Sequence, residues 1–116
     1  MDSLRQLKCV PCRGDVPHLT DEEISQYLPQ VAQWSVIEQE GVKRLQRVFK
    51  IKNYTLALDF SLKVGQLAEA EDHHPSLLIE WGKVTVTWWT HSTKGLHRND
   101  FIMASKTDEL FENLNT

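Results

Sequence analysis

The hydrophobic residues of this chain repeat with a helical period in three places. Thr20 and Glu23 are spaced as in a capping box, which predicts a first helix over residues 21–28. Between residues 53 and 71, hydrophobic residues recur at intervals of four, four and three, as on one face of an amphipathic helix. That stripe is made of Leu56, Phe60, Val64 and Leu67. A similar stripe predicts a last helix and is made of Met103, Thr107, Leu110, Phe111 and Leu114.

Between the predicted helices the period falls to two, which indicates β-strands. Residues 34–38 and 42–51 flank a link that contains a glycine and predict an antiparallel hairpin. Residues 77–81 and 83–91 flank Gly82 and predict a second hairpin. The resulting order is α-β-β-α-β-β-α. It predicts an α+β fold in which three helices cover one face of a four-stranded antiparallel sheet, while the other face is left for water, a ligand or a partner subunit.

Composition and charge narrow the class of protein. At 116 residues the chain is expected to form one domain over residues 18–116, preceded by an N-terminal tail over residues 1–17 that contains "CVPCRGDVP". The 13 Lys and Arg against 16 Asp and Glu give a net charge of −3 without a basic run, which argues against direct binding of nucleic acid. No apolar stretch approaches the roughly 20 residues of a membrane span, and no signal-peptide core is present, so we expect a cytoplasmic protein without a membrane partner.

Three of the five histidines lie at the two ends of the second predicted hairpin. His73 and His74 precede Pro75, which ends the helix and favours an extended backbone at His74. His91 ends the other strand, so antiparallel pairing is expected to bring the three imidazoles close together. Such a cluster suits two chemistries, metal ligation by three nitrogens or general acid and base catalysis near neutral pH.

The spacing of these histidines favours proton transfer over metal binding. Adjacent residues in an extended segment point to opposite sides, and the usual i, i+2 or i, i+4 ligand spacing is absent. Proton transfer only requires that each imidazole reach a different atom of one substrate. A structural role remains the ordinary alternative for a single histidine. Cys9 and Cys12 form a CxxC pair without the second pair of a zinc ribbon, so a simple tail is the plainer interpretation of that segment.

The segments "EDHHP", "WGKVTVTWWTH" and "KGLHRNDF" together resemble the bacterial type of the pterin-4a-carbinolamine dehydratases, over about residues 20–113. The resemblance implies a lyase that dehydrates 4a-hydroxytetrahydrobiopterin to quinonoid dihydropterin, in the recycling of tetrahydropterin for phenylalanine hydroxylase. It implies no metal and no organic cofactor, and a homodimer or homotetramer. On the matching positions His73 and His91 would be general acids toward the 4a-hydroxyl, and His74 would bind the substrate and assist proton removal from the ring nitrogen.

The resemblance also implies residues that bind the substrate. Asp100 would orient or stabilise a histidine or bind the pterin, Trp34 would flank the pocket, Glu69 would contact the pterin, and Pro75 is grouped with them. Helix capping for Asp100, core packing for Trp34 and a solvated helix face for Glu69 are the structural alternatives. A second hypothesis is a non-catalytic binding module or dimerisation cofactor for a protein client, because the same fold is known to serve in that role.

Overall fold

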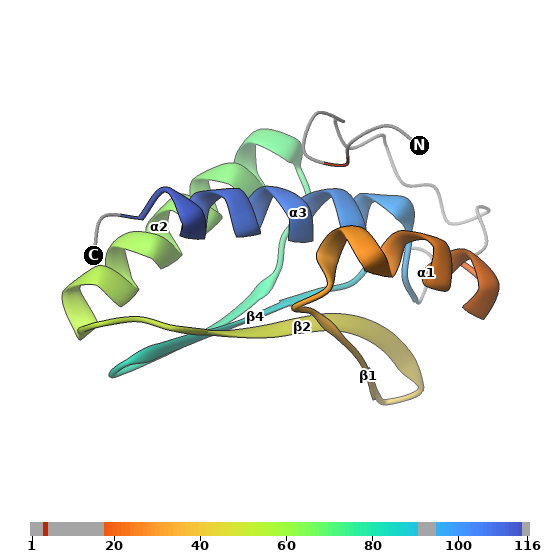
Figure 1. The fold of residues 1–116 in the computed structure, drawn as a ribbon, viewed down its shortest axis with the longest axis horizontal. Coiled ribbons are helices and arrows are strands. Elements are labelled where there is room, and N and C mark those ends of the chain that lie inside the picture. Colours follow the sequence, from red (N-terminus) through yellow and green to blue (C-terminus); the bar gives the residue numbers. More distant parts are fainter. Residues whose placement is uncertain (1–3, 5–17, 91–94, 115–116) are drawn as a thin grey trace.

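The protein folds as three α-helices on one face of a four-stranded sheet (Figure 1), in a computed structural model that describes Leu4 and residues 18–90 and 95–114. The elements in chain order are α1 (Asp21–Tyr27), a short 3₁₀ helix η2 (Leu28–Val31), β1 (Ser35–Gln39), β2 (Val42–Lys50), α2 (Tyr54–Glu71), β3 (Ser76–Glu80), β4 (Lys83–Trp88) and α3 (Arg98–Glu112). The predicted α+β class and the order α-β-β-α-β-β-α are confirmed.

Side-chain caps determine where helices α1 and α2 begin. The Thr20 hydroxyl accepts from the Glu23 N–H at 3.2 Å, and the Glu23 carboxylate accepts from the Thr20 N–H at 2.9 Å, which is the reciprocal capping box expected for α1. The Asn53 side chain accepts from the Leu56 N–H at 2.9 Å and caps α2. Both helices therefore start where their polar signals stand in the sequence.

The sheet has the strand order β1-β2-β4-β3, and neighbouring strands are antiparallel. Each hairpin closes through a two-residue turn, and Glu40, Gly41 and Gly82 in these turns have positive φ. The strands differ at their ends from the sequence prediction, because Trp81 belongs to the second turn, where it is 76% exposed, and β4 ends at Trp88. The β2–α2–β3 connection leaves β3 at the edge of the sheet, with β4 between β2 and β3.

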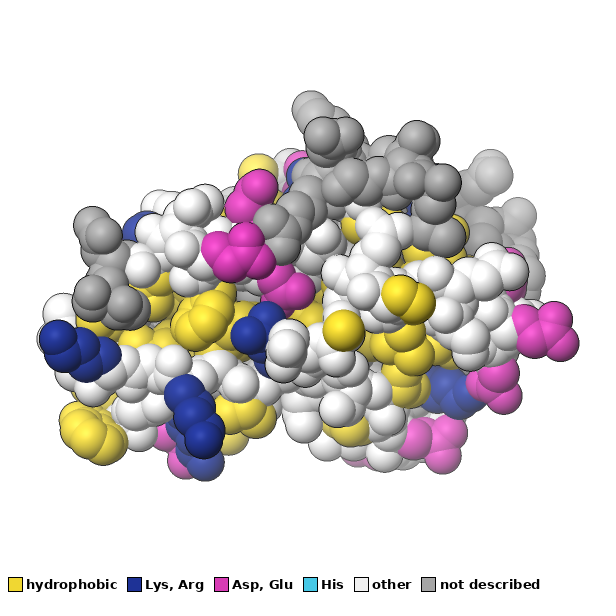
Figure 2. All heavy atoms as spheres, in the orientation of Figure 1, with side chains coloured by type: hydrophobic (Ala, Val, Ile, Leu, Met, Phe, Trp, Pro, Cys, Tyr) yellow, Lys and Arg dark blue, Asp and Glu magenta, His cyan; other side chains and the backbone are white. Residues whose placement is uncertain are grey.

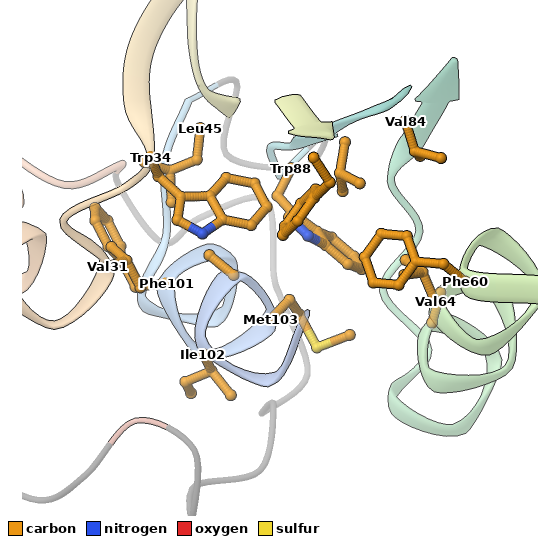
Figure 3. Close-up of a cluster of buried hydrophobic side chains, with 14 of the residues drawn as sticks. Val31, Trp34, Leu45, Phe60, Val64, Val84, Trp88, Phe101, Ile102 and Met103 are labelled. Carbon is orange, nitrogen blue, oxygen red and sulfur yellow. The ribbon is translucent and has the colours of Figure 1, made fainter. Parts of the chain in front are cut away.

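The core lies between the helices and the side chains of β2 and β4 that point toward them (Figure 3). Val84, Val86 and Trp88, at alternate positions of β4, are all fully buried on this face. Leu4, which lies within the predicted tail, is also buried, and its N–H donates to Gln30 Oε1 at 3.1 Å. The rest of residues 1–17 lies outside the described residues, so the boundary at residue 18 stays a prediction.

The opposite face of the sheet and the outer surface are chemically mixed. On the open sheet face Val48 and Leu78 are about half exposed, and the Arg44 guanidinium lies 4.1 Å from the centre of the Trp89 ring. On the surface shown in Figure 2, the dark blue Lys and Arg side chains stand in several separate places among yellow hydrophobic side chains and white atoms. None of the helices in the described part of the chain is long and apolar enough to span a bilayer.

Candidate functional site

The end of helix α2 holds His73 in a fixed position. Asp72 adopts a left-handed conformation with φ 53°, which turns the chain out of the helix. The Asp72 N–H then donates to the Glu69 carbonyl at 3.3 Å, and the His73 N–H donates to the Ala68 carbonyl at 3.1 Å. This pair of bonds is the Schellman pattern of helix ends, here with Asp in place of the more usual Gly. His73 therefore stands on the helix terminus rather than on a long loop.

The His73 ring forms a buried pair with Asp100. Its Nε2 lies 2.6 Å from Asp100 Oδ1, and the two residues are 9% and 0% exposed. The ring also stacks on the Trp88 indole, with centroids 5.7 Å apart and planes 7° from parallel. The pair thus joins the α2–β3 connection to α3, with the end of β4 beneath the ring.

The Asp100 carboxylate is satisfied on both oxygens. Its Oδ2 accepts from the Thr90 hydroxyl at 2.8 Å and from the His97 backbone N–H at 2.9 Å. Asp100 is the third residue of α3, where a carboxylate also interacts favourably with the positive end of the helix dipole. These contacts hold the charge in place and leave Oδ1 for His73.

This geometry defines what the His73 ring can do. An ionised carboxylate only accepts hydrogen bonds, so the proton shared with Asp100 resides on Nε2 of the ring. Nδ1, which has no hydrogen-bond partner among the described residues, can then accept a proton as a base and return it as an acid, while Asp100 stabilises the charged ring. The arrangement is suited to proton transfer.

His74 lies in a different environment from its neighbour. Its Nε2 is 2.7 Å from Glu69 Oε1, and the two side chains are 55% and 80% exposed. Pro75, directly before β3, follows it. The two adjacent histidines therefore contact different carboxylates, one in the protein interior and one at the surface.

Trp34 lies in the core and outside the His73–Asp100 network (Figure 3). It is 4% exposed, and its Nε1–H donates to Asp108 Oδ1 at 2.8 Å. The same oxygen accepts from the Arg47 guanidinium at 2.6 Å. Asp108 is two helical turns beyond Asp100 on α3, so the structure does not bring Trp34 together with His73.

His91, Cys9 and Cys12 lie outside the described residues. His91 directly follows Thr90, which is buried and whose hydroxyl contacts Asp100. Among the residues that the structure describes, no three His, Cys, Asp or Glu side chains are grouped so as to hold a metal ion.

Three residues of the site were missed by the sequence analysis. Trp88 and Thr90 share the parity that faces the helices, so the alternation in β4 contains the signal that locates both next to α3. His97 stands three residues before Asp100, which is capping-box spacing.

Burial lowers the pKa of the half-buried His97 ring, the Asp100 carboxylate opposes this shift, and His73 and Arg98 add to it.

Comparisons with known proteins agree on one family. The family model described as "Pterin 4 alpha carbinolamine dehydratase" matches residues 17–110. A protein of Photobacterium profundum described as "Putative pterin-4-alpha-carbinolamine dehydratase" is 54% identical over 112 residues, covering 97% of this chain and 100% of that protein. The crystal structure of a transcriptional coactivator/pterin dehydratase from Brucella melitensis has a TM-score of 0.72 and 31% identity, covering 80% of this chain and 97% of that one.

Proposed function

Because this chain belongs to the pterin 4 alpha carbinolamine dehydratase family, and is thereby a hydro-lyase, we propose that it dehydrates 4a-hydroxytetrahydrobiopterin by histidine acid and base catalysis. The observation that carries the proposal is the buried contact of 2.6 Å between His73 Nε2 and Asp100 Oδ1. Asp100 then stabilises the ring when it also carries a proton on Nδ1, the proton that His73 as an acid gives to the leaving hydroxyl. The physiological setting we propose is the recycling of tetrahydropterin for phenylalanine hydroxylase.

The reaction breaks the bond between carbon 4a and its hydroxyl oxygen and removes the proton of a ring N–H, so that the products are water and quinonoid dihydropterin. Hydroxide leaves readily only when an acid protonates it, and electrons from the deprotonating nitrogen expel it. We assign the acid role to His73 and His91, and substrate binding with proton removal from nitrogen to His74. No metal or organic cofactor is needed for these steps.

The surroundings of each histidine support this division. Asp100 orients His73, and its two satisfied oxygens favour this role over direct contact with the pterin. Glu69 accepts from His74 at the exposed edge of the site, where a substrate has access. The proximity of His91 in the chain to Thr90 supports a site shared with Asp100. Pterin contacts by Glu69, Trp34 and Pro75 stay predictions.

The test is the rate of dehydration of synthetic carbinolamine, measured directly and in an assay coupled to phenylalanine hydroxylase. Substituting His73 or His91 with Ala is expected to lower kcat by about a hundredfold or more, which is the contribution of acid and base assistance. Lys63→Ala is the control, since it removes only an exposed ion pair with Asp59. A wild-type protein that leaves the rate unchanged refutes the proposal, and loss of activity on chelation points to a metal.

We propose that the protein acts as a homodimer or homotetramer. An apolar groove of about 610 Å³ lies between α2 and the edge strand β3, and Leu58 and Leu62 in it are 46% and 60% exposed. A second copy can cover this surface with the same surface in a two-fold contact. Light scattering during gel filtration measures the mass, and Leu62→Glu is expected to lower it. A monomeric wild type contradicts the assignment.

The groove also supports the second candidate, a binding module for a protein client, because the Brucella melitensis relative is described as a transcriptional coactivator as well as a pterin dehydratase. A stable client complex without dehydratase activity favours the binding module. Dehydratase activity in a homo-oligomer favours the enzyme.

A further inference from the structure

His97 is an unusual helix cap. It is the N-cap of α3, a position that Ser, Thr, Asp and Asn most often occupy. Its ring Nδ1 accepts from the Asn99 N–H at 3.0 Å, in the way that a hydroxyl or carboxylate does in other caps. A ring nitrogen that accepts a hydrogen bond carries no proton, so the neutral His97 ring bears its proton on Nε2.

His97 is also tied to the carboxylate that holds His73. Its backbone N–H donates to Asp100 Oδ2 at 2.9 Å, and its carbonyl accepts from the Asp100 N–H at 2.9 Å. Asp100 then contacts His73 through its other carboxylate oxygen at 2.6 Å. A displacement of the His97 backbone therefore also displaces the Asp100 carboxylate, and with it the His73 ring that this carboxylate contacts.

We propose that His97 is a positioning residue, whose neutral ring caps α3 and thereby keeps Asp100 aligned with His73. The inference rests on the proposed dehydratase function for its kinetic consequence, while its structural part stands apart from that function.

Protonation of the His97 ring removes the cap. A protonated Nδ1 is a donor, so it faces the Asn99 N–H with a proton of its own and the bond is lost. Among the described residues, the charged or titratable groups that act on the ring are Arg98 and Asp100 of α3 and His73 at the end of α2, and of these Asp100 favours the charged form. Burial lowers the pKa of His97, which agrees with a ring that must stay neutral.

Asn53, the N-cap of α2, offers a matched comparison. Its side chain accepts from the Leu56 N–H at 2.9 Å, so Asn53→Ala removes a similar hydrogen bond from a helix of the same domain. It lies at the opposite end of α2 from His73, and so caps a helix terminus remote from the Asp100 carboxylate. If His97 served only to cap its helix, Asn53→Ala and His97→Ala should have the same effect on the His73 ring signals and on kcat.

The structural part is tested by NMR of the ring nitrogens of the ¹⁵N-labelled full chain at pH 7.5. We expect an unprotonated Nδ1 and a protonated Nε2 in His97, and His73 ring signals that shift in His97→Ala but not in Asn53→Ala. A proton on Nδ1 of His97, or His73 signals that ignore His97→Ala, overturns the inference. This outcome is independent of any activity, so it is distinguishable from a failure of the dehydratase proposal, which an inactive wild type reveals.

The kinetic part uses the same variants with synthetic carbinolamine between pH 5 and 8. His97→Ala is expected to lower kcat about fivefold, equivalent to about 1 kcal/mol, with KM changed less than about twofold. The Asn side chain in His97→Asn can cap the helix but does not titrate. This variant should therefore keep most of the wild-type kcat, and its plot of kcat against pH should lack one of the ionisations that lower the rate at acid pH. An equal loss of kcat in Asn53→Ala, or an unchanged acid limb in His97→Asn, contradicts the positioning role. Should His97→Ala not fold, the pH profile of His97→Asn decides.

Discussion

Replacing Asp100 with Asn should move the ring proton of His73 from Nε2 to Nδ1, while the shape of the site stays almost unchanged. Asp100 Oδ2 accepts from Thr90 and from the His97 N–H, so in Asp100→Asn the amide oxygen takes that side and the NH₂ group faces His73. Because an amide NH₂ only donates, His73 Nε2 must then accept, and the ring proton moves to Nδ1. The neutral ring can no longer take a proton at the atom proposed to serve the substrate.

The magnitude follows from what the change removes. Loss of acid and base assistance by one histidine predicts a fall in kcat of about 10²- to 10⁴-fold. Hydrogen bonds to a charged group contribute about 1.5–3 kcal/mol each, and neutral ones about 0.5–1.5 kcal/mol. Asp100 has three such bonds, each weakened by about 1 kcal/mol, so the free energy of unfolding should fall by about 3 kcal/mol. A loss of this size leaves most domains folded at room temperature, so the rate can be measured on native protein.

Three measurements check the prediction for Asp100→Asn: kcat with saturating carbinolamine, the ring nitrogen signals of His73, and urea unfolding. Asp72→Asn is the matched control, because it makes the same chemical change one residue from His73, and Asn tolerates the left-handed conformation of Asp72. A kcat within about threefold of wild type, or a His73 proton that stays on Nε2, refutes the reasoning.

Three further outcomes are expected. Glu69→Gln should change kcat or KM less than about tenfold, because its bond to His74 is exposed, and the difference should shrink at high salt. Trp34→Phe should lower the free energy of unfolding by about 1–3 kcal/mol in urea, since the buried Asp108 carboxylate loses the indole donor, while activity per folded molecule measures any role in the pterin pocket. In the folded protein the pKa of His97 is lowered below its ordinary 6.5, so the unfolded chain binds this proton more readily than the folded one. The free energy of unfolding should therefore fall as the pH drops from above 6.5 through the folded-state pKa of His97. In His97→Asn this fall should be smaller.

The parts of the fold that follow from local patterns could be predicted from the sequence. The capping box of Thr20 and Glu23 and the alternation of Val84, Val86 and Trp88 each depend on residues a few positions apart. The limits of β4 are different, because Thr90 continues the alternation yet pairs with Gly95 in an isolated bridge. A strand ends where the neighbouring backbone no longer pairs with it, and the local sequence pattern does not specify which backbone segment lies there.

The site divides in the same way. His73 and Asp100 were named as candidates because their motifs resemble those of a known family, and the structure brings their side chains into contact. The contact of Trp34 with Asp108 joins residues 74 positions apart, and no local spacing encodes such a pair. His97 was overlooked because His is a rare helix cap, although its spacing to Asp100 matches a capping box.

Helix α3 holds the proposed proton-transferring ring from two sides. Asp100 at its first turn contacts the edge of the His73 ring, and Thr107 accepts from the Trp88 indole, on whose face that ring stacks. Because both supports belong to one rigid helix, displacement of α3 moves the carboxylate and the stacking surface together. Acid and base catalysis depends on hydrogen-bond reach to the reacting proton. The residues that fix α3 are therefore expected to affect the proposed reaction without touching the substrate, and the strongest effect is expected from its N-cap, which adjoins Asp100 itself.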